Sequence, residues 1–94
     1  MRFEWDESKR LSNLEKHGLD FFDVIEVFQR PHVVVPSTYA AQEERFLAIG
    51  ILKGRFVTAS YTIRHEALRI ISFRKARYAE RKKYQELYGS RTQS

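Results

Sequence analysis

Three consecutive stretches of alternating residues constrain the fold of this chain most strongly. They cover residues 44–53, 55–64 and 67–74, and they are separated by Lys53-Gly54 and by His65-Glu66. Alternation places successive side chains on opposite faces of a strand, and such short breaks allow only tight turns. The sequence therefore predicts a three-stranded antiparallel meander.

Helix signals precede the meander. Residues 2–5 are rich in aromatic side chains and too short for a helix, so they predict a first strand. Asp6 is a good N-cap for a helix that ends before Gly18. Asp20 caps a second helix, which Pro31 ends. We expect these two short helices to pack as a hairpin.

Two further elements complete the expected fold. Residues 32–35 are β-branched, and the following Pro36 indicates an edge strand or a strand end, before a loop over 37–43. Helical periodicity returns over residues 75–88 and predicts a basic, amphipathic last helix. The expected fold class is α+β, with two N-terminal helices and a C-terminal helix packed on an antiparallel sheet.

The length and the residue types limit the class of protein. The 94 residues fit a single domain, 1–94, in which 89–94 have the polar composition of a flexible tail. The chain has no cysteine, and its three histidines lack metal-ligand spacing, so we expect neither a metal site nor any other cofactor. No apolar run approaches the ~20 residues that cross a bilayer, so we expect a soluble, cytoplasmic protein.

Charge is distributed very unevenly along the chain. Residues 1–47 carry six basic and nine acidic side chains, whereas residues 48–94 carry eleven and three, and the net charge is +5. A cationic half of this size attracts polyanions through counterion release. RNA or DNA is the partner that this pattern favours, while an acidic protein and membrane headgroups are alternatives.

The parity of residues within the strands suggests where an RNA would lie. Odd positions are mostly apolar and are expected under the helices: Leu47, Ile49, Ile51, Val57, Ala59, Tyr61, Ile63, Ile71 and Phe73. Even positions are mostly small or polar and are expected to form the floor of a groove: Ala48, Gly50, Thr58, Ser60, Thr62, Arg64, Ser72 and Arg74. A floor of small residues lets a nucleotide backbone approach closely, and Arg64 and Arg74 would grip its phosphate.

Cleavage of RNA without a metal requires a base, an acid and a cation that stabilises the phosphorane. Arginine suits the last role because its planar fork binds two phosphate oxygens, so we assign Arg64 and Arg74 to it. The alternative is that both are solvated strand-end arginines or ion-pair partners of Glu66 and Glu80. His17 is the candidate base or acid because histidine titrates near neutral pH. Its structural alternative is to interact with the dipole at the helix end before Gly18.

Other basic residues are candidates for holding the RNA backbone. They are Lys16, Arg77, Arg81 and Lys82. The alternative for each is a solvated position on a helix surface.

Short motifs spread along the chain resemble a known family. They include Phe3-Glu4-Trp5-Asp6, Lys16-His17-Gly18, Glu44-Arg45, and the run Arg69-Ile70-Ile71-Ser72-Phe73-Arg74-Lys75-Ala76, followed by Glu80-Arg81 and Tyr84. In order and spacing the chain resembles the BrnT toxins of type II toxin–antitoxin systems, over about residues 3–88.

The resemblance implies a RelE-like fold and a ribonuclease toxin that inhibits translation until a BrnA-like antitoxin binds it. Such antitoxins carry a ribbon-helix-helix DNA-binding part, so operator DNA would be bound only through the complex. Two other functions are consistent with the residues: a non-catalytic RNA- or ribosome-binding module, including a degenerate toxin, and an interaction protein whose basic face receives an acidic antitoxin segment.

Overall fold

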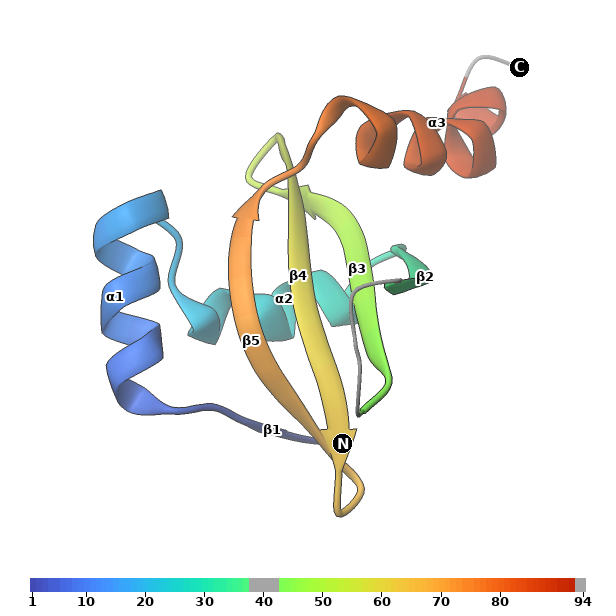
Figure 1. Cartoon of the computed structure of the whole chain (residues 1–94). Helices are drawn as coiled ribbons and strands as arrows, with labels where there is room; N and C mark the ends of the chain where they lie inside the picture. Colours follow the sequence, from blue (N-terminus) through green and yellow to red (C-terminus); the bar gives the residue numbers. More distant parts are fainter. Residues whose placement is uncertain (38–42, 93–94) are drawn as a thin grey trace.

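The computed structural model describes residues 1–37 and 43–92, which form an α+β fold around one five-stranded sheet (Figure 1). The elements are β1 (Arg2–Glu4), α1 (Glu7–His17), the 3₁₀ helix η1 (Phe21–Asp23), α2 (Val24–Gln29), β2 (Val33–Ser37), β3 (Arg45–Leu52), β4 (Arg55–Arg64), β5 (Ala67–Lys75) and α3 (Tyr78–Thr92). The strand order is β1-β5-β4-β3-β2. No described helix is both long and apolar enough to span a membrane.

The predicted meander is confirmed, but the sheet is mixed. Strands β2 to β5 pair antiparallel, and β2 lies at an edge, as Pro36 indicated. Both tight turns use left-handed backbone, with φ of 51° and 80° at Lys53-Gly54 and of 48° and 65° at His65-Glu66. The expectation of a wholly antiparallel sheet is wrong because β1 pairs parallel with β5.

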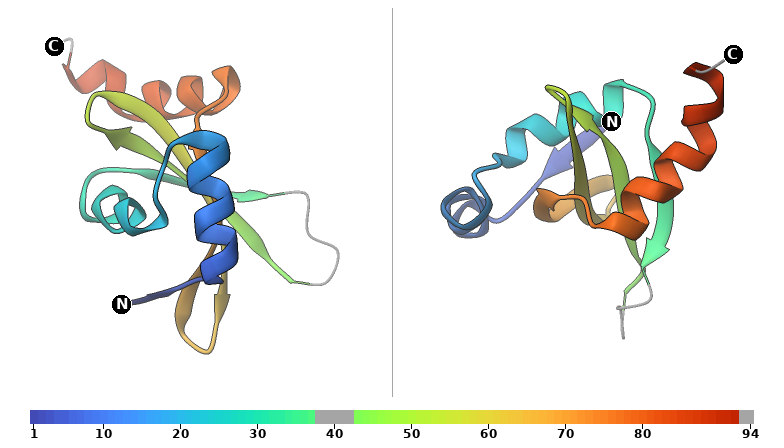
Figure 2. Two further views of the ribbon diagram at one scale, coloured as in Figure 1. Left: turned by 90° about the vertical axis from the view of Figure 1, so that its left-hand side faces the viewer. Right: turned by 90° about the horizontal axis from the view of Figure 1, so that it is seen from above.

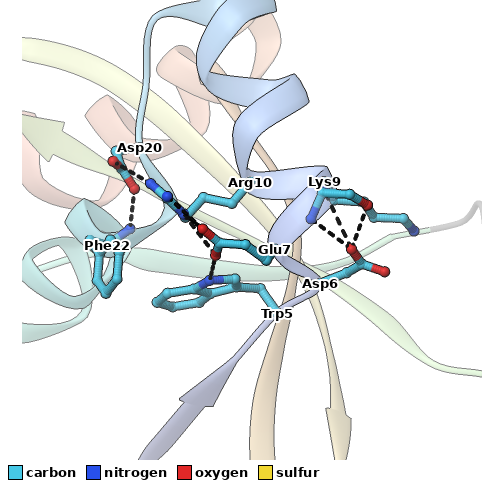
Figure 3. A network of polar contacts seen from close by, with 8 residues as sticks. Trp5, Asp6, Glu7, Lys9, Arg10, Asp20 and Phe22 are labelled. Carbon is cyan, nitrogen blue, oxygen red and sulfur yellow. Dashed lines mark hydrogen bonds and ion pairs between the residues drawn. The ribbon is translucent and has the colours of Figure 1, made fainter.

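The predicted caps bound α1. The Asp6 side chain accepts hydrogen bonds from the backbone N–H groups of Ser8 and Lys9, at 2.9 and 3.4 Å, and Gly18 ends the helix with φ 70°. Arg10 then ties α1 to the next segment, because its guanidinium contacts both Glu7 and Asp20 (Figure 3). Asp20 in turn caps η1 through the Phe22 N–H.

The two N-terminal helices do not form the expected hairpin. α1 runs alongside β5, whereas α2 crosses behind the sheet (Figures 1 and 2). The second helix also begins as the 3₁₀ turn η1 before it becomes α-helical at Val24. Buried side chains from the α1–η1 connection, η1, α2 and the sheet form the core: Leu19, Phe21, Val24, Val27, Ala48, Leu52, Val57, Ala59, Tyr61, Leu68, Ile70 and Phe73.

The parity assignment of the two sheet faces is correct for β4 and wrong for β3. A two-residue turn pairs Leu52 with Arg55, so residues that share a face have opposite parity in the two strands. The face against α2, here the α2 face, therefore carries Ala48 and Gly50, which were expected in the groove. The opposite α3 face carries Leu47, Ile49, Ile51, Thr58, Ser60, Thr62, Arg64, Arg69, Ser72 and Arg74. Ile71 is the extra residue of a bulge in β5 and lies at the groove instead of in the core.

Gly50 makes room for α2 and not for a nucleotide, and its replacement tests this contact. A Cβ at this position would lie 3.0 Å from Cγ1 of Val27, whose side chain is fully buried. We expect Gly50→Ala to lower the free energy of unfolding by about 1–3 kcal/mol in urea titrations, because a packed core tolerates extra volume poorly. Gly89→Ala, whose nearest contact would be 3.7 Å, is the control and should be neutral or stabilising. Equal effects of the two variants would contradict this packing.

Helix α3 lies on the α3 face, at the end of the sheet where β5 finishes (Figure 2). It begins at Tyr78, three residues later than the periodicity indicated, because Lys75 still pairs with Val57 and the Ala76 N–H still donates to the Phe56 carbonyl. It continues to Thr92 and so includes residues 89–92 of the expected tail. Residues 38–42 of the expected loop and 93–94 of the tail lie outside the described residues.

Candidate RNA-binding groove

An open groove of about 590 Å³ lies on the α3 face, where β5 meets the start of α3. Guanidinium groups and small hydroxyl side chains dominate its polar lining. The lining residues are Pro36, Ser37, Arg45, Leu47, Ser60, Ile71, Ser72, Arg74, Arg77 and Glu80. The groove combines cationic walls with a floor of serine, which suits a phosphate ligand.

A bidentate ion pair between Arg74 and Glu80 lies at one end of this groove. Nη1 and Nη2 of Arg74 donate to the two carboxylate oxygens at 2.8 and 2.9 Å. Oε1 of Glu80 also accepts from the Thr58 hydroxyl at 2.9 Å and from the Arg77 N–H at 2.8 Å. Because Arg77 precedes the first turn of α3, Glu80 acts as the capping glutamate of that helix. One carboxylate therefore joins β4, β5 and α3.

This environment keeps Glu80 ionised. Burial acts to raise its pKa, but hydrogen bonds from Arg74, the Arg77 N–H and Thr58 outweigh burial and lower the pKa to about 2. The same bond to Glu80 raises the pKa of Arg74. A carboxylate with so low a pKa and all these donors is a poor general base near neutral pH. Glu80 is a positioning residue.

The pKa of Glu80 predicts how stability depends on pH. A carboxyl group whose pKa falls from 4.5 to about 2 on folding contributes stability above pH ~4.5 and loses it as pH falls towards 2. The contribution at neutral pH is about 3 kcal/mol. We expect Glu80→Gln to be less stable than wild type at pH 7, and the two stability curves to converge near pH 2 in urea titrations. Glu86→Gln, an exposed glutamate on the same helix, should keep the wild-type curve. Parallel curves for wild type and Glu80→Gln would contradict this role.

Two arginines at the groove differ in what they can offer a ligand. Arg74 retains its Nε–H and one Nη2–H without an acceptor among the described residues, so it presents oriented donors while Glu80 neutralises its charge. The exposed Arg77 side chain has no acidic partner in the part of the chain that the structure describes. Arg74 therefore offers hydrogen-bond donors in fixed orientations, and Arg77 adds net positive charge.

The structure does not bring Arg64 and Arg74 together, although both lie on the α3 face. Arg74 pairs with Thr58, and Arg64 lies six residues further along β4, which is roughly 20 Å at the usual rise per residue. Arg64 contacts Glu43 at 3.3 Å and not Glu66. Two arginines so far apart cannot grip one phosphate. The pairing of Arg74 with Glu80, which was the structural alternative for this arginine, is present at 2.8 Å.

The remaining candidates are spread over several surfaces. Lys16 and His17 are in the last turn of α1, where basic side chains suit the helix dipole, and neither lines the groove. Arg81 lies 5.9 Å from the ring centroids of both Phe56 and Tyr78, outside the groove. Lys82 lies 6.0 Å from the Tyr78 ring centroid. Of the residues predicted to contact RNA, Arg74 and Arg77 line the groove.

Within residues 1–37 and 43–92, no histidine lines the groove and no three His, Asp or Glu side chains gather as a metal ligand set. The lining arginines offer positive charge and directed hydrogen-bond donation. These are the properties that stabilise a phosphate as its charge increases.

Sequence reasoning missed two parts of this arrangement. Arg45 lines the groove from β3, a strand whose residues the parity argument assigned to the wrong faces of the sheet. Arg69 was expected on the helix-covered face, but it pairs with Thr62 and contacts Glu4 at 2.9 Å on the α3 face. Counting residue pairs across the two-residue turns would have found Arg45 and Arg69.

Comparison with protein families identifies the chain. Residues 5–80 match the family described as the ribonuclease toxin, BrnT, of type II toxin-antitoxin systems. The chain belongs to the BrnT family. The matched range begins at Trp5, in the network of Figure 3, and ends at Glu80. It therefore contains both the contacts of Arg10 with Glu7 and Asp20 and the Arg74–Glu80 pair. A comparison with individual curated proteins gave no match.

Proposed function

We propose that this BrnT protein is a metal-independent endoribonuclease whose reaction takes place in the groove at the start of α3. The observation that carries the proposal is the family match over residues 5–80. The groove supports it by offering Arg74, Arg77 and Arg45 around one open volume. We further propose that residues 1–94 form a single RelE-like domain.

The proposed reaction is an internal transesterification of RNA. The 2′-oxygen forms a bond to the adjacent phosphorus, the bond from phosphorus to the 5′-oxygen breaks, and the 2′,3′-cyclic phosphate remains. The 2′-hydroxyl loses a proton and the departing 5′-oxygen gains one. The phosphorane carries extra negative charge, which preorganised cationic donors stabilise.

Arg74 and Arg77 are the residues to which we assign this stabilisation. Glu80 fixes the Arg74 guanidinium from one side and leaves donors for the phosphate. Arg77 supplies uncompensated charge at the same groove. Arg64 is no longer assigned to the phosphate, and His17 is no longer assigned to proton transfer, because neither lines the groove.

The proposed partner is a BrnA-like antitoxin with a ribbon-helix-helix part, through which the complex would bind operator DNA. The toxin released from it would cleave RNA in the cytoplasm and inhibit translation. Membership of this family by itself implies an antitoxin partner and an RNA substrate.

A specific observation favours a second candidate function. Among the described lining residues there is no histidine, and the carboxylate of Glu80 is held by Arg74, Thr58 and the Arg77 N–H. A described lining that offers neither a histidine nor an available carboxylate for proton transfer suits a module that binds RNA or a ribosome without cleaving it. Such a module would show salt-sensitive RNA affinity and no product.

The deciding experiment is incubation of the purified chain with a long RNA in excess EDTA, both free and on translating ribosomes, followed by analysis of the fragment ends. We expect fragments with 2′,3′-cyclic phosphate or 3′-phosphate ends. The Arg74→Ala, Arg77→Ala double variant should yield none. Salt-sensitive RNA binding without cleavage under either condition would contradict the nuclease function and support the binding module.

A further inference from the structure

A second hollow, of about 370 Å³, lies beside the groove at the turn between β3 and β4. Its described lining contains three basic side chains, one aromatic ring and no acidic residue. The lining residues are Gly54, Arg55, Phe56, Lys75, Ala76 and Arg81. We call this site the turn pocket.

Ion pairing distinguishes the turn pocket from the rest of the sheet. On the α3 face Arg64 pairs with Glu43, Arg69 with Glu4 and Arg74 with Glu80. Arg55, Lys75 and Arg81 have no acidic partner among the described residues, and Arg55 and Lys75 are exposed. The uncompensated positive charge is therefore concentrated at this end of the molecule, and a polyanion is drawn there first.

The connector between β5 and α3 separates the turn pocket from the groove. Arg74 and Arg77 line the groove, while the two residues between them, Lys75 and Ala76, line the turn pocket. The Ala76 N–H donates to the Phe56 carbonyl at 3.0 Å, which fixes the connector against β4. The two sites therefore adjoin on either side of this short connector, and an extended ligand that occupies the groove has only the connector to cross to reach the turn pocket.

Contacts with Tyr84 and Arg81 hold the aromatic ring of the turn pocket in place. The Phe56 ring meets the Tyr84 ring edge-on at 5.6 Å between centroids, and the Arg81 guanidinium lies 5.9 Å from the Phe56 centroid. A guanidinium held beside an aromatic ring presents both charge and a flat surface, which are the features that single-stranded nucleic acids use.

We propose that the turn pocket binds the phosphate of an RNA nucleotide that flanks the one in the groove, with Arg55 and Lys75 as its main cationic contacts. This inference rests on the proposed function, because it takes the groove to hold RNA. The flat surface that Arg81 and Phe56 form favours RNA over an acidic protein segment, because a nucleobase can stack on it and a carboxylate cannot.

Binding of an RNA that cannot be cleaved tests this proposal separately from catalysis. The probe is a single-stranded RNA with 2′-O-methyl groups throughout. Its affinity for the full chain is measured by fluorescence anisotropy between 50 and 300 mM salt, over which the Debye length falls from roughly 14 to roughly 6 Å. For Arg55→Ala, Lys75→Ala we expect roughly tenfold or greater loss of affinity at about 0.1 M salt and a decrease of about 1.4 in the salt slope. Lys9→Ala, Lys83→Ala removes the same charge outside both sites and should change the slope far less.

The outcomes separate the possible ligands. A loss of affinity and slope confined to the pocket variant, with an unchanged melting temperature, supports the proposal. Equal effects of the two double variants on affinity and slope overturn the proposal. It is also overturned if the pocket variant binds RNA as wild type does but loses affinity for a glutamate-rich peptide. If wild type cleaves natural RNA but the pocket variant binds the probe normally, the pocket proposal fails and the nuclease proposal stands.

Discussion

Asn13→Ala is expected to lower the free energy of unfolding by about 3 kcal/mol. Asn13 is the buried residue of α1, and its side-chain amide donates to the carbonyls of Leu19 and Phe73 at 3.0 and 2.8 Å. Its Oδ1 accepts from the Phe73 N–H at 3.1 Å. Alanine would leave the Leu19 carbonyl and the two backbone groups of Phe73 in β5 without these partners, and each buried group left unpaired costs about 1–3 kcal/mol.

The amide of Asn13 takes the place of a neighbouring strand at this edge. β1 pairs with β5 only as far as Arg69, so the backbone of Phe73 would otherwise have no partner on that side. Leu11→Ala is the matched control, because Leu11 is on the same helix and is 52% exposed. Its effect in urea titrations should stay within about 0.5 kcal/mol. A loss for Asn13→Ala no larger than the loss for Leu11→Ala would contradict the edge-capping role.

Arg77→Ala is expected to reduce the rate of RNA cleavage on the order of 10²-fold. A preorganised donor to a developing anion typically contributes 10² to 10³ in rate, and Arg77 lines the groove with its charge unpaired among the described residues. The fold should persist, because the bond from Arg77 to Glu80 comes from the backbone N–H and survives the substitution.

Arg64→Ala is the control for this prediction, since it removes an arginine from the same face of the sheet at the far end of β4. Its cleavage rate should stay within about threefold of wild type, because its ion pair with Glu43 is on the surface and such pairs contribute little. Rates are compared under single-turnover conditions at equal salt. If Arg64→Ala lost more activity than Arg77→Ala, the reaction site would lie at the other end of the sheet.

Local features of the fold were predictable because local residues determine them. Lys53-Gly54 specifies a tight hairpin turn, and Asp6 and Gly18 cap α1 as their residue types indicate. The helix surface that contacts the sheet was not predictable from apolar spacing. Leu11 and Leu14 remain exposed, while the polar Asn13 is buried.

Assigning residues to the two faces of the sheet requires the register between strands, which alternation within one strand does not contain. The two-residue turn at Lys53-Gly54 reverses parity between β3 and β4, and the bulge at Ile71 reverses it again within β5. Arg74 was found from the sequence because it lies beyond the bulge on the polar face. Its distance from Arg64 follows only from the register, which places these two arginines at opposite ends of β4 and β5.

The measurement that tests the central claim most directly is mapping of backbone amide chemical shifts in the ¹⁵N-labelled chain during titration with the 2′-O-methyl RNA. If RNA lies in the groove at the start of α3, the largest shifts should occur over residues 72–81, with further shifts over 54–56 at the turn pocket. The amides of 16–18 and 64–66 should shift least. The opposite pattern, with shifts concentrated at 16–18 or 64–66 and none over 72–81, would contradict the assignment of this groove as the RNA site.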